Sequence, residues 1–116
     1  RFKCASKYND FLSSLNWIKT PELSPHSYHI FHQYSILISD EIARDQLKKQ
    51  LAKNGIPTMI YYPIPIHDQE AYQKYKIHDY PVADKLSRQI LALPMHTELD
   101  DSQIAFICDT IKQFVN

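Results

Sequence analysis

The residues best suited to chemistry lie in the run Tyr61 to Gln69, which reads Tyr-Tyr-Pro-Ile-Pro-Ile-His-Asp-Gln. Pro63 and Pro65 push the residues before them out of the helical region, and neither can donate a backbone hydrogen bond. The run should therefore be extended and close to a surface. Residues two apart share a face in a strand, and residues three apart do so in polyproline II. Tyr61 and His67 are six apart, so either backbone predicts a phenol and an imidazole on one side.

Two alternatives remain open at this stretch and near it. The run could be a proline-stiffened loop whose tyrosine rings only cap a core, although loops also carry much of the function of proteins. His29 and His32 are the second pair of candidates, but on a strand residues three apart point to opposite faces. The sequence has neither a Cys-x-x-Cys nor a His-Glu-x-x-His motif, so we expect no metal site.

The sequence offers no complete catalytic set. Cys108 belongs to an apolar helical stripe that should bury it, which makes it a poor nucleophile. Asp100 and Asp101 form a carboxylate pair, yet helix capping explains them better. Tyr61, Tyr62 and His67 therefore stay the leading candidates for a binding role.

Composition narrows the class of protein. The chain has 116 residues, 44% hydrophobic and 22% charged, with a formal net charge of zero, which predicts one globular domain and neither a nucleic-acid nor a membrane partner. Cys4 and Cys108 fall in helical patterns, so buried free thiols in a reducing cytoplasm are expected rather than a disulfide. Gly55 is the single glycine, which excludes glycine-rich phosphate loops.

Periodicity predicts the elements that must position these residues. The expected order is helix, strand, helix, strand, helix, short strand and helix. The first ranges are a helix over 1–16, a short strand at 17–18 and a strand over 28–38, in which Tyr34, Ile36 and Ile38 alternate with polar or outward positions. A helix then follows that Ser39 or Asp40 can cap and that runs to about Asn54, with Gly55 as its left-handed cap, and after it a strand over 56–60. The remaining ranges are a helical turn over 70–75, a helix from Pro81 to Ile90 with an apolar stripe of Val82, Leu86 and Ile90, a strand over 91–93, and a last helix begun by the Asp100 and Gln103 pair. We therefore expect an α/β fold in which a small sheet of about three strands is covered by helices on one face.

Three blocks of sequence resemble the C-terminal domain of the pyridoxal-phosphate (PLP)-dependent sugar aminotransferases of the DegT/DnrJ/StrS type. They are His29-Ile30-Phe31-His32-Gln33-Tyr34, then Gly55-Ile56-Pro57-Thr58 with Tyr61 to His67, then Tyr80-Pro81-Val82-Ala83 through Leu93-Pro94-Met95 to Glu98-Leu99. Two departures stand out: Tyr61 occurs where the family often has histidine, and His96-Thr97 occurs where it often has Phe-Pro.

The resemblance implies a fold, a reaction and partners. It implies the small, mostly antiparallel C-terminal domain of the aspartate-aminotransferase-like (type I PLP) fold. It implies transfer of an amino group, usually from glutamate, to a keto group of a nucleotide-linked sugar, in amino-sugar and surface-polysaccharide biosynthesis. The full-length chains of this family resemble one another in being homodimers. On this interpretation Tyr61, Tyr62, His67, His29 and His32 border the sugar-nucleotide substrate.

The same resemblance places the cofactor outside these residues. The lysine that holds PLP belongs to the family's large N-terminal domain, so this chain should contain no catalytic or cofactor-binding residue. Arg1 already lies inside a helical pattern, and we expect residues 1–116 to be a single-domain fragment of a longer aminotransferase, with 1–16 the end of an inter-domain helix. The rival hypothesis is a stand-alone α/β module that binds a metabolite or regulates without catalysis, because a fold does not fix a function.

Overall fold

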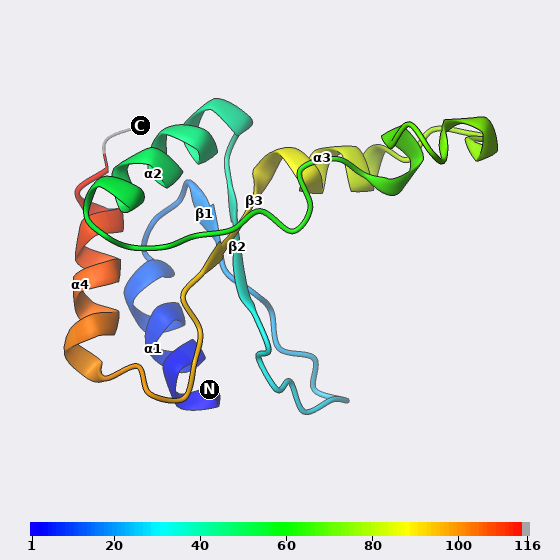
Figure 1. Ribbon diagram of the computed structural model, residues 1–116. Coiled ribbons are helices and arrows are strands. Elements are labelled where there is room, and N and C mark those ends of the chain that lie inside the picture. The colour runs from blue at the N-terminus through cyan, green and yellow to red at the C-terminus, as the bar shows by residue number, and fades with distance from the viewer. Residues whose placement is uncertain (115–116) are drawn as a thin grey trace.

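A three-stranded antiparallel sheet organises the molecule, whose computed structural model describes residues 1–114 (Figure 1). Strand β1 (Ile18–Lys19) pairs with β2 (Tyr34–Ile38), and β2 pairs with β3 (Ile90–Leu93), giving the order β1-β2-β3. Tyr34 lies opposite Leu93 and Leu37 lies opposite Ile90. The predicted α/β class and the short antiparallel sheet are confirmed.

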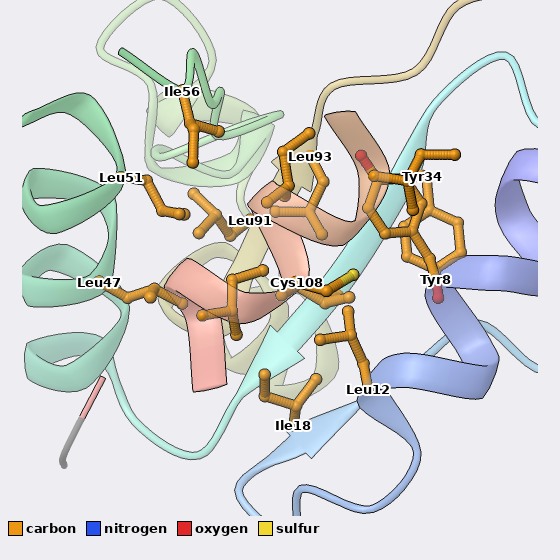
Figure 2. Packing of buried hydrophobic residues seen from close by; sticks show 14 of the residues in the cluster. Tyr8, Leu12, Ile18, Tyr34, Leu47, Leu51, Ile56, Leu91, Leu93 and Cys108 are labelled. Carbon is orange, nitrogen blue, oxygen red and sulfur yellow. The ribbon is translucent and has the colours of Figure 1, made fainter. Parts of the chain in front are cut away.

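Three helices pack on one face of this sheet. They are α1 (Phe2–Leu12), α2 (Glu41–Lys53) and α4 (Asp101–Lys112). Alternation on β2 places Tyr34, Ile36 and Ile38 on the buried face, where they meet apolar side chains from the helices. Figure 2 shows this core, in which Leu12, Leu47 and Cys108 come from the three helices.

Capping explains where α2 begins and ends and where α4 begins. The carboxylate of Asp40 accepts the backbone N–H of Ala43 at 2.8 Å, so Asp40, of the two residues predicted as possible caps, is the N-cap of α2. At its other end Gly55 has φ = 73°, and the N–H of Ile56 reaches the carbonyl of Leu51 at 2.9 Å. This is a Schellman ending with the predicted glycine in the left-handed position. Helix α4 begins with the predicted capping box between Asp100 and Gln103.

The first helix and the expected strand over 28–38 are shorter than predicted. Helix α1 ends at Leu12, so the expectation of helix up to residue 16 is wrong. Within 28–38 only Tyr34–Ile38 is a strand, because Phe31 has φ = 46° and cannot continue a ladder. The Nδ1 atom of His29 accepts the N–H of Phe31 at 2.9 Å, and this local turn replaces strand pairing.

The prediction of a strand over 56–60 is wrong: these described residues form no strand, and a single bridge between Met59 and Ala92 joins them to the sheet. Pro57 has no N–H to donate, and the carbonyl of Thr58 accepts instead from Lys48 Nζ at 2.8 Å. Sheet pairing therefore involves only Met59 of this segment.

Helix α3 (Pro81–Gln89) and the segment before it project from the helical body (Figure 1). Ile90, expected to end this helix, is the first residue of β3. The predicted apolar stripe of α3 is not a core stripe, since Val82 is 71% exposed and Ser87 is the only residue of α3 that is buried. Two short 3₁₀ turns, η1 (Ile66–Asp68) and η2 (Gln73–Tyr75), precede α3. Among residues 1–114 we find no helix with both the length and the apolar character needed to cross a bilayer.

Candidate functional site

A pocket of about 570 Å³ opens between the projecting segment and α3. Tyrosine rings and aliphatic side chains make most of its wall, and His67, Lys76 and Ser87 add polar groups to the tyrosine hydroxyls. The lining residues are Tyr61, Tyr62, Ile64, Pro65, Ile66, His67, Tyr72, Tyr75, Lys76, Tyr80, Ala83, Leu86, Ser87 and Ile90. A concave aromatic wall with a few polar groups is the usual character of a small-molecule site.

The backbone over 61–69 differs from the predicted one. Turn η1 interrupts the segment at Ile66, so Tyr61 and His67 do not share one unbroken extended run, and the argument from backbone period is wrong. The prolines dictate extended backbone only next to themselves, and the following residues close a turn through the N–H of Asp68 and the carbonyl of Pro65 at 3.0 Å. Tyr61 and His67 nevertheless line the same pocket, because the chain folds back toward α3.

His67 is the best-anchored polar side chain of this pocket. Its side chain is 10% exposed, and its Nε2 lies 2.7 Å from Oδ1 of Asp84 on α3. The ring of Tyr80 lies 4.8 Å from the imidazole, measured between ring centroids. Asp84 is seventeen residues from His67, so no local spacing in the sequence indicates the pair.

A second carboxylate near His67 is already paired with a cation. Asp68 Oδ2 lies 3.5 Å from Nε2 of His67, while Asp68 Oδ1 accepts from Lys76 Nζ at 3.1 Å. This bond to Asp68 is the main reason that the pKa of Lys76 is raised, and the charges of Asp79 and Asp84 add to the effect. Lys76 is therefore held as an ammonium ion.

His67, Asp68 and Asp84 lie close enough to one another to be considered as ligands of one metal ion. One ligand atom from each of His67, Asp68 and Asp84 lies within 4.8 Å of the other two. A cation there would have to displace the Lys76 ammonium from Asp68 and the proton between His67 and Asp84. The existing hydrogen bonds and ion pair account for the cluster, and we assign no metal to it.

The histidines of the β1–β2 connection lie apart from this pocket. His32 lines a neighbouring pocket of about 270 Å³, and Tyr61 lines both pockets. His29 lines neither of these pockets; its ring packs on Phe31 with centroids 4.1 Å apart. The structure thus brings together Tyr61, Tyr62 and His67, with His32 adjacent and His29 separate.

Sequence reasoning missed several groups around the pocket. Tyr72, Tyr75 and Tyr80 were visible as a cluster of tyrosines, although no period assigned them to one wall. Arg44 was hidden in an apolar helical pattern: it is 3% exposed and donates to the carbonyl of Ser87 at 3.0 Å. This bond ties α2 to the end of α3, while Asp45, also on α2, pairs with Arg44 at 2.6 Å.

The sequence profile of the DegT/DnrJ/EryC1/StrS aminotransferase family matches residues 1–112. The chain belongs to this family. A relative from Acidithiobacillus ferrooxidans, named UDP-N-acetyl-3-dehydro-alpha-D-glucosamine 3-aminotransferase, is 37% identical over 97% of this chain. The pleiotropic regulatory protein of Geobacillus stearothermophilus is 36% identical over 98% of this chain.

Solved structures of the family share this fold. A DegT/DnrJ/EryC1/StrS aminotransferase from Brucella abortus is 37% identical, with a TM-score of 0.86 over 96% of this chain and 29% of that chain. DesV from S. venezuelae, solved with a ketimine intermediate, is 27% identical, with a TM-score of 0.89 over 99% of this chain and 32% of that chain. The chain spans 31% and 30% of the length of the Geobacillus and Acidithiobacillus relatives.

Proposed function

We propose that residues 1–116 are the C-terminal small domain of a PLP-dependent aminotransferase that transfers an amino group, from glutamate, to a keto group of a nucleotide-linked sugar in amino-sugar biosynthesis. The observation that carries this proposal is the match of residues 1–112 to the aminotransferase family. It is supported by the 37% identity to a relative whose name specifies a UDP-linked sugar as substrate.

In this proposal the pocket beside α3 borders the sugar-nucleotide. Tyr61, Tyr62 and His67 line it, and Tyr61 and Tyr62 are at least one-third exposed, so their side chains are accessible to a ligand. Tyrosine offers a flat face to the C–H groups of a sugar ring and a hydroxyl to its oxygens. His32 would contribute from the adjacent pocket. His29, whose Nδ1 is bonded to the Phe31 N–H, would act by shaping its loop.

The residues that line this pocket do not fit PLP itself. A Schiff base needs a neutral lysine amine, whereas the only lysine that lines the pocket, Lys76, is paired with Asp68 at 3.1 Å and has a raised pKa. Gly55, the sole glycine, lies outside the pocket, so no glycine-rich phosphate loop is available there. We therefore propose that the cofactor is held by another part of the full-length protein.

The proposal extends to assembly and compartment. We infer a homodimer of the full-length protein, which rests on the family resemblance alone. Cys4 and Cys108 are both buried and unpaired, which supports a reducing compartment such as the cytoplasm.

The experiment compares the full-length protein with residues 1–116 expressed alone. Each is mixed with PLP, glutamate and keto-sugar nucleotides, and release of 2-oxoglutarate is measured. We expect turnover by the full-length protein and none by residues 1–116, because we propose that the cofactor is held by another part of the full-length protein. An inactive full-length protein, tested with UDP- and dTDP-linked keto-sugars, would overturn the proposed reaction. Turnover by residues 1–116 alone would overturn their assignment as a partial domain.

A second candidate is a binding or regulatory module without catalysis, and the name of the Geobacillus relative is the observation that favours it. The two candidates differ in one measurable property. A regulator would bind a sugar-nucleotide or another metabolite in the pocket while the full-length protein releases no 2-oxoglutarate.

A further inference from the structure

Helix α3 fixes both the position and the orientation of His67. Asp84 lies in the first turn of this helix, and its Oδ1 is 2.7 Å from Nε2 of His67. The Tyr80 ring, at the N-terminal boundary of the same helix, packs beside the imidazole. Pro81 starts the helix at a position where its missing N–H is not needed. The imidazole is therefore held by a rigid element and not by the loop that carries it.

The partner of Nε2 determines the tautomer of His67. An ionised carboxylate can only accept a hydrogen bond, so Nε2 of His67 must hold the proton that Asp84 accepts. In the neutral ring, Nδ1 then has no proton and is a hydrogen-bond acceptor. Within residues 1–114 the Nδ1 atom has no hydrogen-bond partner, while the ring lines the pocket. A hydroxyl of a bound ligand can donate to this atom.

Asp84, and not Asp68, is the carboxylate that sets this orientation. The 3.5 Å from Asp68 Oδ2 to Nε2 is longer than a good hydrogen bond, and Lys76 already engages the other oxygen of Asp68. The Asp84 side chain is 26% exposed, against 45% for Asp68, so its bond to His67 is better shielded from water. Replacing Asp84 should therefore disturb the orientation of His67 more than replacing Asp68.

We propose that Asp84 is a positioning residue for the transamination: it fixes His67 so that Nδ1 accepts a hydrogen bond from a hydroxyl of the sugar-nucleotide. This inference rests on the proposed function, because it needs a hydroxyl-bearing substrate in the pocket. Asp84 acts through His67 and does not itself contact the substrate. An amide at position 84 can donate as well as accept, so it no longer obliges Nε2 to hold the proton.

The kinetic test uses the full-length protein with the isosteric change Asp84→Asn, and with Asp68→Asn as the matched control from the same cluster. We expect Asp84→Asn to lower kcat/KM for the keto-sugar nucleotide about tenfold, chiefly through KM. Asp68→Asn should stay within about twofold of wild type. The half-reaction with glutamate should keep its rate in both variants, because no sugar is bound in it. Asp84→Glu, which restores a carboxylate, should recover part of the loss.

A spectroscopic measurement separates positioning from a general structural role. With ¹⁵N-labelled histidine in the full-length protein, the His67 ring signals are assigned by their loss in His67→Gln. We expect the pattern of a protonated Nε2 and an unprotonated Nδ1 in the wild type and in Asp68→Asn, and its change in Asp84→Asn. This readout on the wild type does not depend on how well any Asp84 variant folds.

The possible failures are distinguishable. A wild-type protein without sugar-dependent turnover overturns the proposed function, and the role of Asp84 with it. A wild-type protein that turns over while Asp84→Asn keeps its sugar KM overturns only the role of Asp84. A His67 ring protonated at Nδ1 alone in the wild type overturns the tautomer assignment and the proposed hydrogen bond.

Discussion

Tyr61 borders both of the pockets in which candidate side chains lie. It lines the large pocket with His67 and the smaller one with His32, and it is 36% exposed. A phenol hydroxyl can both donate and accept hydrogen bonds. Removing the Tyr61 hydroxyl is therefore the most direct test of the proposed substrate site.

Tyr61→Phe in the full-length protein removes that hydroxyl and keeps the ring. One lost hydrogen bond is worth about 0.5–1.5 kcal/mol, so we expect kcat/KM for the keto-sugar nucleotide to fall roughly three- to tenfold. His67→Ala also removes packing and should have the larger effect. The glutamate half-reaction should survive both changes. Tyr28→Phe is the matched control, because Tyr28 is 80% exposed and lines neither pocket. Full sugar-dependent activity in both Tyr61→Phe and His67→Ala would mean that the two side chains are structural.

At the scale of elements, the ending of α2 determines how the chain enters the 56–60 segment. Gly55 adopts φ = 73°, which lets Ile56 bond back to Leu51 and place its side chain in the core, at 3% exposure. From there the chain passes along β3 through the Met59 bridge and reaches Tyr61. The α2 cap therefore directs the chain toward the candidate site.

Gly55→Ala tests this element. A β-carbon at position 55 would meet no atom within 4 Å, so any loss comes from the backbone conformation alone. The left-handed region is unfavourable for alanine by about 1–2 kcal/mol, and we expect the free energy of unfolding to fall by that amount in denaturant titration. Gly55→Asn should lose less, because asparagine tolerates this region. The control Lys53→Ala changes an exposed helical side chain and should be nearly neutral. If Gly55→Ala unfolded at the same denaturant concentration as the wild type, the assignment of Gly55 as the left-handed cap of α2 would be wrong.

At the scale of the whole molecule, the core contains ionisable groups that stay neutral. Burial raises the pKa of the Cys108 thiol from 9.0 to about 12. Burial likewise raises the pKa of Tyr8 and of Tyr34 above the ordinary 10.0. Tyr8 donates to the carbonyl of Pro94 at 2.9 Å and Tyr34 donates to Asn9, so the protonated hydroxyls are also the hydrogen-bonding forms.

These shifts predict a loss of stability in alkali. Above pH 9 the unfolded chain releases the Cys108 proton while the folded chain keeps it up to about pH 12. Stability from this group is therefore complete below pH 9 and falls as pH rises toward 12, and the two tyrosines act in the same direction above pH 10. We expect Tm to decrease between pH 9 and pH 11 at constant salt, and to decrease less steeply in Cys108→Ala and Tyr34→Phe. A wild-type Tm that stays constant from pH 9 to pH 11 would contradict the raised pKa values of Cys108, Tyr8 and Tyr34.

The sequence by itself determined those parts that depend on neighbouring residues. The caps at Asp40, Gly55 and Asp100 followed from residue type and spacing, and the alternation of Tyr34, Ile36 and Ile38 assigned the buried face of β2. Each of these is a local preference of backbone or period, which needs no distant partner. The family was also recognisable in the sequence, because its motifs are contiguous blocks.

Only the tertiary structure decided which residues meet across long separations. The prolines correctly indicated a segment near the surface, but the extended backbone predicted for it is interrupted by η1. The backbone period therefore does not bring Tyr61 and His67 together; the fold of the chain against α3 does. Asp84 reaches His67 across seventeen residues, and Arg44 reaches Ser87 across forty-three. Such pairs depend on how helices and loops pack, and packing energy is set by three-dimensional complementarity that no short sequence window contains.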